Sequence, residues 1–296
     1  EKKPIPVKKL VESANVTSAV VKALIDKEIF EEYYIQQDRV MYSGEATKKE
    51  LLLSNAQQEA FDAIQNQFSN REVCLLHGVT SSGKTEIYIK WIETFLATGK
   101  QVLYLLPEIA LTTQLVSRLR LHFGDKVAVF HSKFNNNERV EVWYQVLQNA
   151  ENAQIVIGAR SALFLPFQQL GAIIVDEEHE QTFKQHDPAP RYHARDAAIV
   201  LAKQHGAKVV LGSATPSLET YYNVQSKKYG LTELKVRYGN VVLPEIQLVD
   251  LKDKYFRKKM SGHFSDELLE EITETLSKGE QVILFQNRRG FSPYVE

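Results

Sequence analysis

The sequence predicts an α/β protein with a mostly parallel β-sheet covered by helices. Between about residues 54 and 225, short continuous apolar runs alternate with longer mixed segments, as is typical of strands buried on both faces. The runs expected to form strands are residues 73–78, 101–107, 127–131, 154–160, 172–177 and 208–214. A glycine-rich loop follows the first run, and adjacent acids end the fifth. Ligands gather beyond the carboxyl ends of parallel strands, so we expect a binding site there.

Patterns along the chain divide it into three regions. Residues 1–45 are expected to form a partial winged-helix-like unit, because two short amphipathic helices precede the strand-like run FEEYYIQQDRV. A helical interaction module would give the same pattern, and the residues leave both interpretations open. Residues 46–230 contain the predicted sheet. Residues 231–296 are expected to begin a second α/β unit, with strands at IQLVDL and QVILFQNRRG on either side of a helix over residues 265–277.

Composition limits the class of protein. Hydrophobic residues at 44% and charged residues at 25% are ordinary for globular protein, and no apolar run is long enough to span a membrane. The single cysteine, Cys74, excludes an internal disulfide and suits a reducing cytoplasm. We therefore expect a cytoplasmic protein that does not bind membranes. The net charge of −1 does not indicate nucleic-acid binding by itself, and the strongest local basic run, residues 252–259, is more typical of a solvated loop.

Residues 78–85 read GVTSSGKT, a phosphate-binding loop (P-loop) placed between a predicted strand and a predicted helix. Backbone N–H groups of such a loop bind phosphate oxygens, Lys84 would reach the β- and γ-phosphates, and the Thr85 hydroxyl would bind Mg²⁺. The residues expected to hold the nucleotide are Gly78, Ser81, Ser82, Gly83, Lys84 and Thr85. The sequence therefore predicts ATP and Mg²⁺ as cofactors.

The run IIVDEEH supplies the second half of the predicted site. A buried strand that ends in adjacent acids would deliver Asp176 to the metal and Glu177 to a water in line with the γ-phosphate. Acids after a strand often serve only to solvate a loop. Following a P-loop in the same sheet, this pair indicates nucleoside triphosphate hydrolysis, with Lys84, Asp176 and Glu177 as the catalytic residues.

The order of motifs narrows the class further. Asp-Glu-Glu-His, followed by Ser213-Ala214-Thr215 after the next buried run, resembles the DExH group of superfamily 2 helicases. The segments GVTSSGKTEIY, LPEIALTTQ, GARSALFLPF, IIVDEEH, FKQHDPAPRYHARD, GSATPSLET and LFQNRRGFSP resemble, in order, the motifs of the PriA family of bacterial replication-restart helicases. The resemblance implies a RecA-like fold for the P-loop lobe and the start of a second RecA-like lobe after it.

The resemblance also implies residue roles. Thr112, Arg160 and Ser161 are expected to contact the backbone of single-stranded DNA, as hydroxyl and guanidinium groups can without reading sequence. Residues 183–196 resemble the family's aromatic-rich loop, which links DNA binding to hydrolysis. There Phe183 and Tyr192 would provide stacking faces. The cations expected at DNA are Lys184, Arg191 and Arg195, and the residues expected to couple nucleotide and DNA are His179, Ser213 and Thr215.

Upstream of the P-loop, Gln57 stands where helicases often place an adenine-reading glutamine. Any polar residue would suit this position of the predicted helix, and the adjacent Gln58 is a second glutamine that could be the one concerned. The sequence leaves the assignment open.

Taken together, these features predict the core of an ATP-dependent 3′ to 5′ DNA helicase that acts at stalled forks in primosome assembly. The implied partners are single-stranded and forked DNA, primosome proteins and single-strand-binding protein. The family's zinc ligands are not found in this sequence, so we expect no zinc here. Two alternatives stay open: a superfamily 2 double-strand translocase subunit, and a nucleotide-gated DNA-binding module without turnover.

The sequence starts without methionine and stops soon after a strand-like run, so we expect a piece of a longer protein. We also expect it to bind nucleotide yet hydrolyse ATP very slowly. The family's arginine-bearing motif of the second lobe is not found in this sequence, and such arginines contribute roughly 10³ to 10⁵ in turnover.

Overall fold

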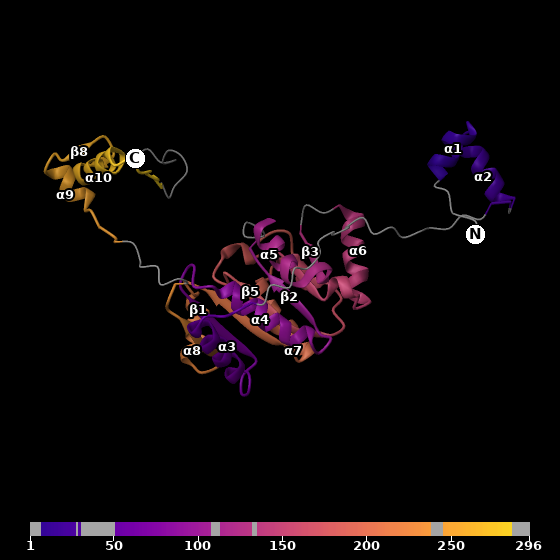
Figure 1. Ribbon diagram of the computed structural model, residues 1–296, viewed down its shortest axis with the longest axis horizontal. Helices are drawn as coiled ribbons and strands as arrows, with labels where there is room; N and C mark the ends of the chain where they lie inside the picture. The colour runs from indigo at the N-terminus through magenta and orange to yellow at the C-terminus, as the bar shows by residue number, and fades with distance from the viewer. Residues whose placement is uncertain are drawn as a thin grey trace. The chain divides into compact units, whose positions relative to one another are not determined.

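The computed structural model describes residues 7–27, 29–30, 51–107, 113–131, 135–237 and 245–285 (Figure 1). The chain separates into two compact units, Glu1–Asn240 and Val241–Glu296. Among the described residues, no helix is both long and apolar enough to cross a membrane.

A seven-stranded sheet forms the centre of the first unit, with the strand order β3-β4-β2-β5-β6-β1-β7. Every neighbouring pair is parallel, which confirms the predicted α/β fold. The strands are β1 (Val73–Gly78), β2 (Gln101–Leu105), β3 (Val127–Phe130), β4 (Ile155–Gly158), β5 (Leu170–Asp176), β6 (Lys208–Ser213) and β7 (Gly230–Leu234).

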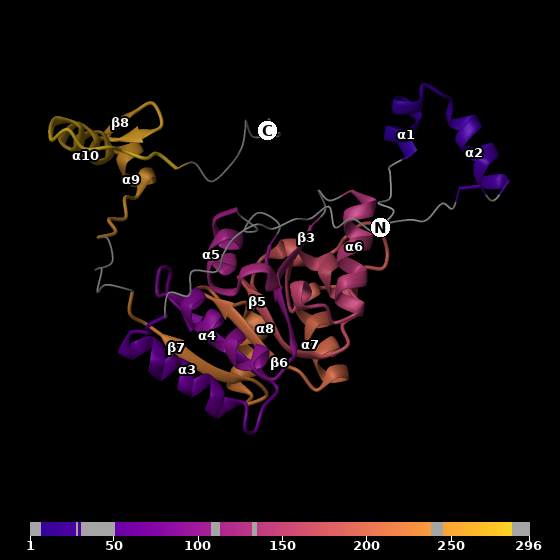
Figure 2. The same cartoon turned by 45° about the vertical axis from the view of Figure 1, so that its right-hand side comes forward.

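Side chains alternate between the two faces of each strand, so the sheet has a hydrophobic core on each side. Leu75 belongs to the core cluster that includes residues of α6 (Asn136–Leu147) and α7 (Ala194–His205), whereas its neighbour Leu76 belongs to the cluster that includes residues of α3 (Asn55–Gln67), α4 (Lys84–Leu96) and α5 (Thr113–Phe123). Helices therefore cover both faces (Figure 2). Helix α8 (Leu218–Gln225) follows β6 in the same lobe. We call the sheet and these helices the P-loop lobe.

The edge strand β7 was not predicted. It pairs with β1 in the register Cys74↔Gly230, so the sheet continues to Leu234, past the boundary expected at residue 230. Its sequence, GLTEL, alternates buried and more exposed positions. An edge strand of this kind lacks the continuous apolar run by which the central strands were recognised.

The N-terminal region contains α1 (Val7–Ala14) and α2 (Ser18–Asp26), where the apolar periodicity predicts two helices. Thr17 is the N-cap residue of α2. Most of the run FEEYYIQQDRV lies outside the described residues. The winged-helix-like unit therefore stays a prediction beside the helical alternative.

The second unit differs from expectation. It contains α9 (Leu251–Phe256), the antiparallel pair β8 (Met260–Ser261) and β9 (Phe264–Ser265), and α10 (Asp266–Ser277). The strands expected at IQLVDL and QVILF are not formed: residues 245–250 and 281–285 have no regular structure, and Leu251 begins α9. A strand needs a partner for its backbone N–H and C=O groups, and among the described residues of this unit only the short β8-β9 pair supplies one.

The basic run 252–259 belongs to α9 and the turn after it. Lys254 forms ion pairs with Asp266 and Glu267, and Arg257 pairs with Asp253 within the helix. These cations therefore neutralise acids of the same unit.

Candidate nucleotide-binding site

Three motifs meet at the carboxyl ends of adjacent strands. The P-loop follows β1, residues 176–179 end and follow β5, and residues 213–215 end and follow β6, which lies between β1 and β5. They border a pocket of about 410 Å³. Its lining includes the predicted residues Ser81, Ser82, Gly83, Lys84, Thr85, Asp176, Glu177, His179 and Thr215, together with Thr80, Glu86, Arg118 and Ala214.

The P-loop backbone is folded around an open space. Gly83 has φ +84°, a conformation that residues with a side chain rarely adopt, and a Cβ there would also displace the Gln57 amide, whose Nε2 would lie 2.1 Å away. The Lys84 ammonium donates to the Gly78 carbonyl at 2.9 Å, which holds it over the loop. The buried Ser82 hydroxyl has no hydrogen-bond partner. An unpaired buried hydroxyl beside a lysine and a helix N-terminus fits a phosphate ligand.

Asp176 is the acid at the base of the pocket. Its Oδ1 accepts from the Tyr88 hydroxyl and its Oδ2 from the Tyr104 hydroxyl, each at 3.1 Å. Burial raises the pKa of Asp176 to about 6, and the neighbouring Glu177 carboxylate adds to the rise, while Lys84 and the two hydroxyls act against it. A carboxylate held beside Lys84 and Thr85 fits a magnesium ion that also binds nucleotide phosphates.

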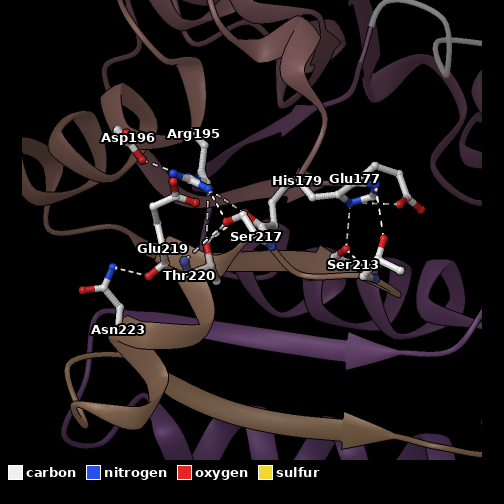
Figure 3. Close-up of polar contacts among 11 residues, drawn as sticks. Glu177, His179, Arg195, Asp196, Ser213, Ser217, Glu219, Thr220 and Asn223 are labelled. Atoms are coloured by element: carbon white, nitrogen blue, oxygen red, sulfur yellow. Dashed lines mark hydrogen bonds and ion pairs between the residues drawn. The ribbon is translucent and has the colours of Figure 1, made fainter.

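His179 joins the acids to the end of β6. Its Nδ1 lies 2.8 Å from Ser213 Oγ, which also accepts the Thr215 backbone N–H at 2.9 Å. The same Nδ1 atom also lies 3.7 Å from Glu177 Oε2. Figure 3 shows this chain of contacts. The three residues expected to act in coupling are thus brought together beside Glu177.

A buried polar cluster lies behind the pocket and was not predicted. Glu178 has no exposed surface, and its Oε2 lies 2.9 Å from Arg195 Nη1. The Ser217 N–H and the Thr220 hydroxyl each donate to the same carboxylate at 2.8 Å. Figure 3 shows Arg195 pointing toward Ser217 and Thr220 at the start of α8. We refer to Glu178, Arg195, Ser217 and Thr220 as the buried cluster.

This cluster corrects the expectation that Arg195 contacts DNA. Its side chain is buried, with Nη1 paired to Glu178 and Nε paired to Asp196. The reason is local: α7 begins at Ala194, and the helix turns Arg195 inward. The sequence signal for the cluster was weak, because its members lie far apart along the chain.

Comparison with known proteins places this site in a family. The family model for DEAD/DEAH box helicases matches residues 54–224, which is more than half of the chain. The chain belongs to the DEAD/DEAH box helicase family. Membership of this family implies use of ATP and Mg²⁺. Among the described residues no group of three or more His, Cys, Asp or Glu could hold a metal ion unaided. Magnesium in such sites takes several ligands from phosphates and water.

Individual relatives are similar over nearly the whole chain. The chain is 44% identical to the replication restart protein PriA of Bacillus subtilis, covering 98% of this chain and 36% of that protein. It is 43% identical to PriA of Haemophilus influenzae, over 94% of this chain and 38% of that protein, and 38% identical to PriA of Chlamydia trachomatis, over 98% and 39%. The chain thus spans well under half the length of these relatives.

In this member of the DEAD/DEAH box helicase family, several residues expected to bind DNA lie together. Arg160 Nη1 donates to the carbonyls of Thr182 and Lys184 at 3.3 and 3.1 Å, and the Tyr192 hydroxyl donates to the Arg160 carbonyl at 3.5 Å. The ring of Tyr192 packs edge-on against exposed Phe164, with centroids 5.2 Å apart. Phe164 was not predicted as part of this surface, because in the sequence it belongs to the apolar run ALFLPF.

The other residues predicted to bind DNA differ in their exposure. Arg191 is exposed and Ser161 is partly buried, whereas Thr112 lies outside the described residues. Phe183 is buried in the hydrophobic core, which corrects its assignment as a stacking face. Its 3-10 turn directs the ring inward, where an aromatic side chain is stabilised by packing.

Gln57 is held by the fold of its own helix. Its Oε1 accepts the Ser54 N–H at 2.9 Å in a capping box, and its Nε2 donates to the Gly83 carbonyl at 3.3 Å. Gln58 instead bonds to Asp62 on the exposed side of α3. Of the two glutamines, Gln57 is the one that reaches the P-loop.

Proposed function

We propose that this chain is the ATP-binding motor core of a replication-restart DNA helicase that acts at stalled forks in the bacterial cytoplasm. The observation that carries the proposal is the convergence of three motifs on one pocket: the P-loop with Lys84, the acids Asp176 and Glu177, and Ser213-Thr215 reached through His179. Similarity to the PriA proteins supports the replication-restart role.

Four residues of the pocket have direct roles in the proposed hydrolysis: Lys84, Thr85, Asp176 and Glu177. Lys84 would turn its ammonium from the Gly78 carbonyl to the β- and γ-phosphates. Thr85 and Asp176 would hold Mg²⁺, which when bound neutralises charge on the phosphates. Glu177, at φ +50° on the turn after β5, would accept a proton from the attacking water. Gln57 would meet the nucleotide only if its amide left the capping box.

DNA would bind beside Arg160, Ser161, Lys184, Arg191 and Tyr192. A guanidinium and hydroxyls can hold phosphates, and the Phe164–Tyr192 pair offers aromatic faces on which bases stack. His179, Ser213 and Thr215 would relay between nucleotide and DNA, because they connect the acids to the end of β6. The 3′ to 5′ direction and the primosome and single-strand-binding partners also belong to the proposal.

The test uses the full-length protein that contains this chain. Strand displacement should occur on forked DNA with a 3′ single-stranded arm, require ATP and Mg²⁺, and disappear in Lys84→Ala. Triplex displacement on duplex DNA without strand separation would favour the double-strand translocase instead. DNA binding that responds to nucleotide without turnover would leave only the nucleotide-gated module.

A further inference from the structure

Two buried tyrosines converge on one carboxylate from separate elements. Tyr88 comes from α4 and Tyr104 from β2, and both side chains are almost completely buried. Their hydroxyls donate to different oxygens of Asp176, each at 3.1 Å. The two rings pack edge to face with centroids 5.6 Å apart, so each ring limits the movement of the other. The Glu177 N–H adds a third donor to Oδ1 at 3.2 Å.

The backbone beside Asp176 is shaped to admit one of these hydroxyls. Gly212 of β6 is the register partner of Asp176 on β5. A Cβ at Gly212 would lie 1.7 Å from the Tyr88 hydroxyl oxygen and 3.0 Å from Asp176 Oδ1. Any larger residue would therefore displace the hydroxyl. Three elements thus fix where the Tyr88 hydroxyl sits.

Packing alone does not require these hydroxyls. Phenylalanine would fill nearly the same volume, and a buried hydroxyl is tolerated only where it finds a partner. A carboxylate accepts about four hydrogen bonds, so three donors set the plane of the Asp176 group and leave one acceptor position, on Oδ2, for a metal. Partners that orient a metal ligand typically contribute 10- to 100-fold to metal affinity or activity.

We infer that Tyr88 and Tyr104 are positioning residues that orient the Asp176 carboxylate for the magnesium ion bound with nucleotide. Gly212, which has no side chain, leaves the space that the Tyr88 hydroxyl occupies. This inference rests on the proposed function. It adds three residues that act on the metal through Asp176 without touching it.

The test measures binding by the chain itself. Affinity for a fluorescent ADP is determined with saturating Mg²⁺ and again with EDTA, and the ratio of the two gives the metal-dependent part. We expect Tyr88→Phe and Tyr104→Phe each to reduce that ratio about tenfold and leave the EDTA affinity within about twofold. Tyr229→Phe is the matched control, because Tyr229 is also buried in this lobe but its charged neighbours are Asp196, Arg195 and Glu178.

A merely structural role would lower the affinity equally with Mg²⁺ and with EDTA, and that result would overturn the inference. So would an unchanged ratio in both variants when the wild type responds to Mg²⁺. A wild-type ratio of one would overturn the proposed nucleotide and metal site instead. Gly212→Ala gives an independent reading: it should lower the ratio as Tyr88→Phe does, and adding Tyr88→Phe to it should have little further effect. Independent, multiplying effects would contradict the role given to Gly212.

Discussion

Replacing Arg195 with methionine should destabilise the P-loop lobe by about 3 kcal/mol. The change keeps an apolar stem but leaves the Glu178 carboxylate, which has no exposed surface, without its cation. Breaking a buried ion pair by removing one partner costs about 3 to 5 kcal/mol. We expect the lower end of this range, because the Ser217 N–H and the Thr220 hydroxyl still donate to Glu178.

Urea unfolding followed by tryptophan fluorescence measures this loss. The chain has two tryptophans, Trp91 and Trp143, and both lie in helices of the P-loop lobe, so the signal reports that lobe. With a urea dependence of about 1 to 3 kcal/mol per molar, the midpoint should fall by roughly 1 to 3 M. Adding Glu178→Gln to Arg195→Met should recover most of the stability, because the buried charge is then gone.

The control is the exposed Lys90–Glu93 pair on α4 in the same lobe. Lys90→Met should change the unfolding free energy by less than about 1 kcal/mol, because exposed pairs contribute little. A loss below about 1 kcal/mol for Arg195→Met would refute the reasoning. An equal loss in the double variant would do the same, since it would locate the cost in packing.

Three further changes test the proposed site. Lys84→Ala in the full-length protein should abolish ATP turnover and leave nucleotide-free DNA binding intact; unchanged turnover would contradict the P-loop role. Tyr192→Ala should weaken DNA-stimulated turnover more than nucleotide affinity, losing about 1 to 3 kcal/mol of DNA affinity, whereas exposed Tyr221→Ala should not. Asp176 has a pKa of about 6 against an ordinary 3.8, so its favourable contribution to folding is lost as pH rises through 6. Asp176→Asn should therefore gain stability over wild type between pH 4 and pH 7.5, by at most about 3 kcal/mol, and a pH-independent difference would argue against the shift.

Local patterns predicted the centre of the lobe well. Each of the six predicted strands, β3 at one edge of the sheet included, is a short apolar run, and these runs are almost entirely buried. The P-loop and the acids after β5 could also be predicted, because the chemistry of each motif depends on residues that are close together in sequence. Strand β7 was not predicted because its sequence, GLTEL, has no continuous apolar run, and its pairing partner β1 lies about 150 residues away in the sequence.

Inward and outward placement was harder to predict. Residues 183–196 read as one stretch of aromatic and basic side chains, yet Phe183 and Arg195 are buried while Arg191 is exposed. What decides the difference is the 3-10 turn at one end and the start of α7 at the other. The partner that makes a buried Arg195 stable is Glu178, which lies on another element. Neither turn nor partner is visible from residue type alone.

The run from Asp176 to His179 faces two environments, and this bears on the proposed coupling between DNA binding and hydrolysis. Asp176, Glu177 and His179 line the pocket, whereas Glu178 points into the buried cluster. Arg195 of that cluster lies directly after the segment that carries Tyr192. In the proposed coupling, a shift of this segment on DNA binding would act on Glu178 through the Arg195–Glu178 ion pair. Glu178 directly follows Glu177 in the chain, so the shift would be passed to Glu177. Because Tyr88 and Tyr104 hold Asp176 separately, such a shift would move Glu177 relative to the metal ligand, and turnover would change more than nucleotide affinity.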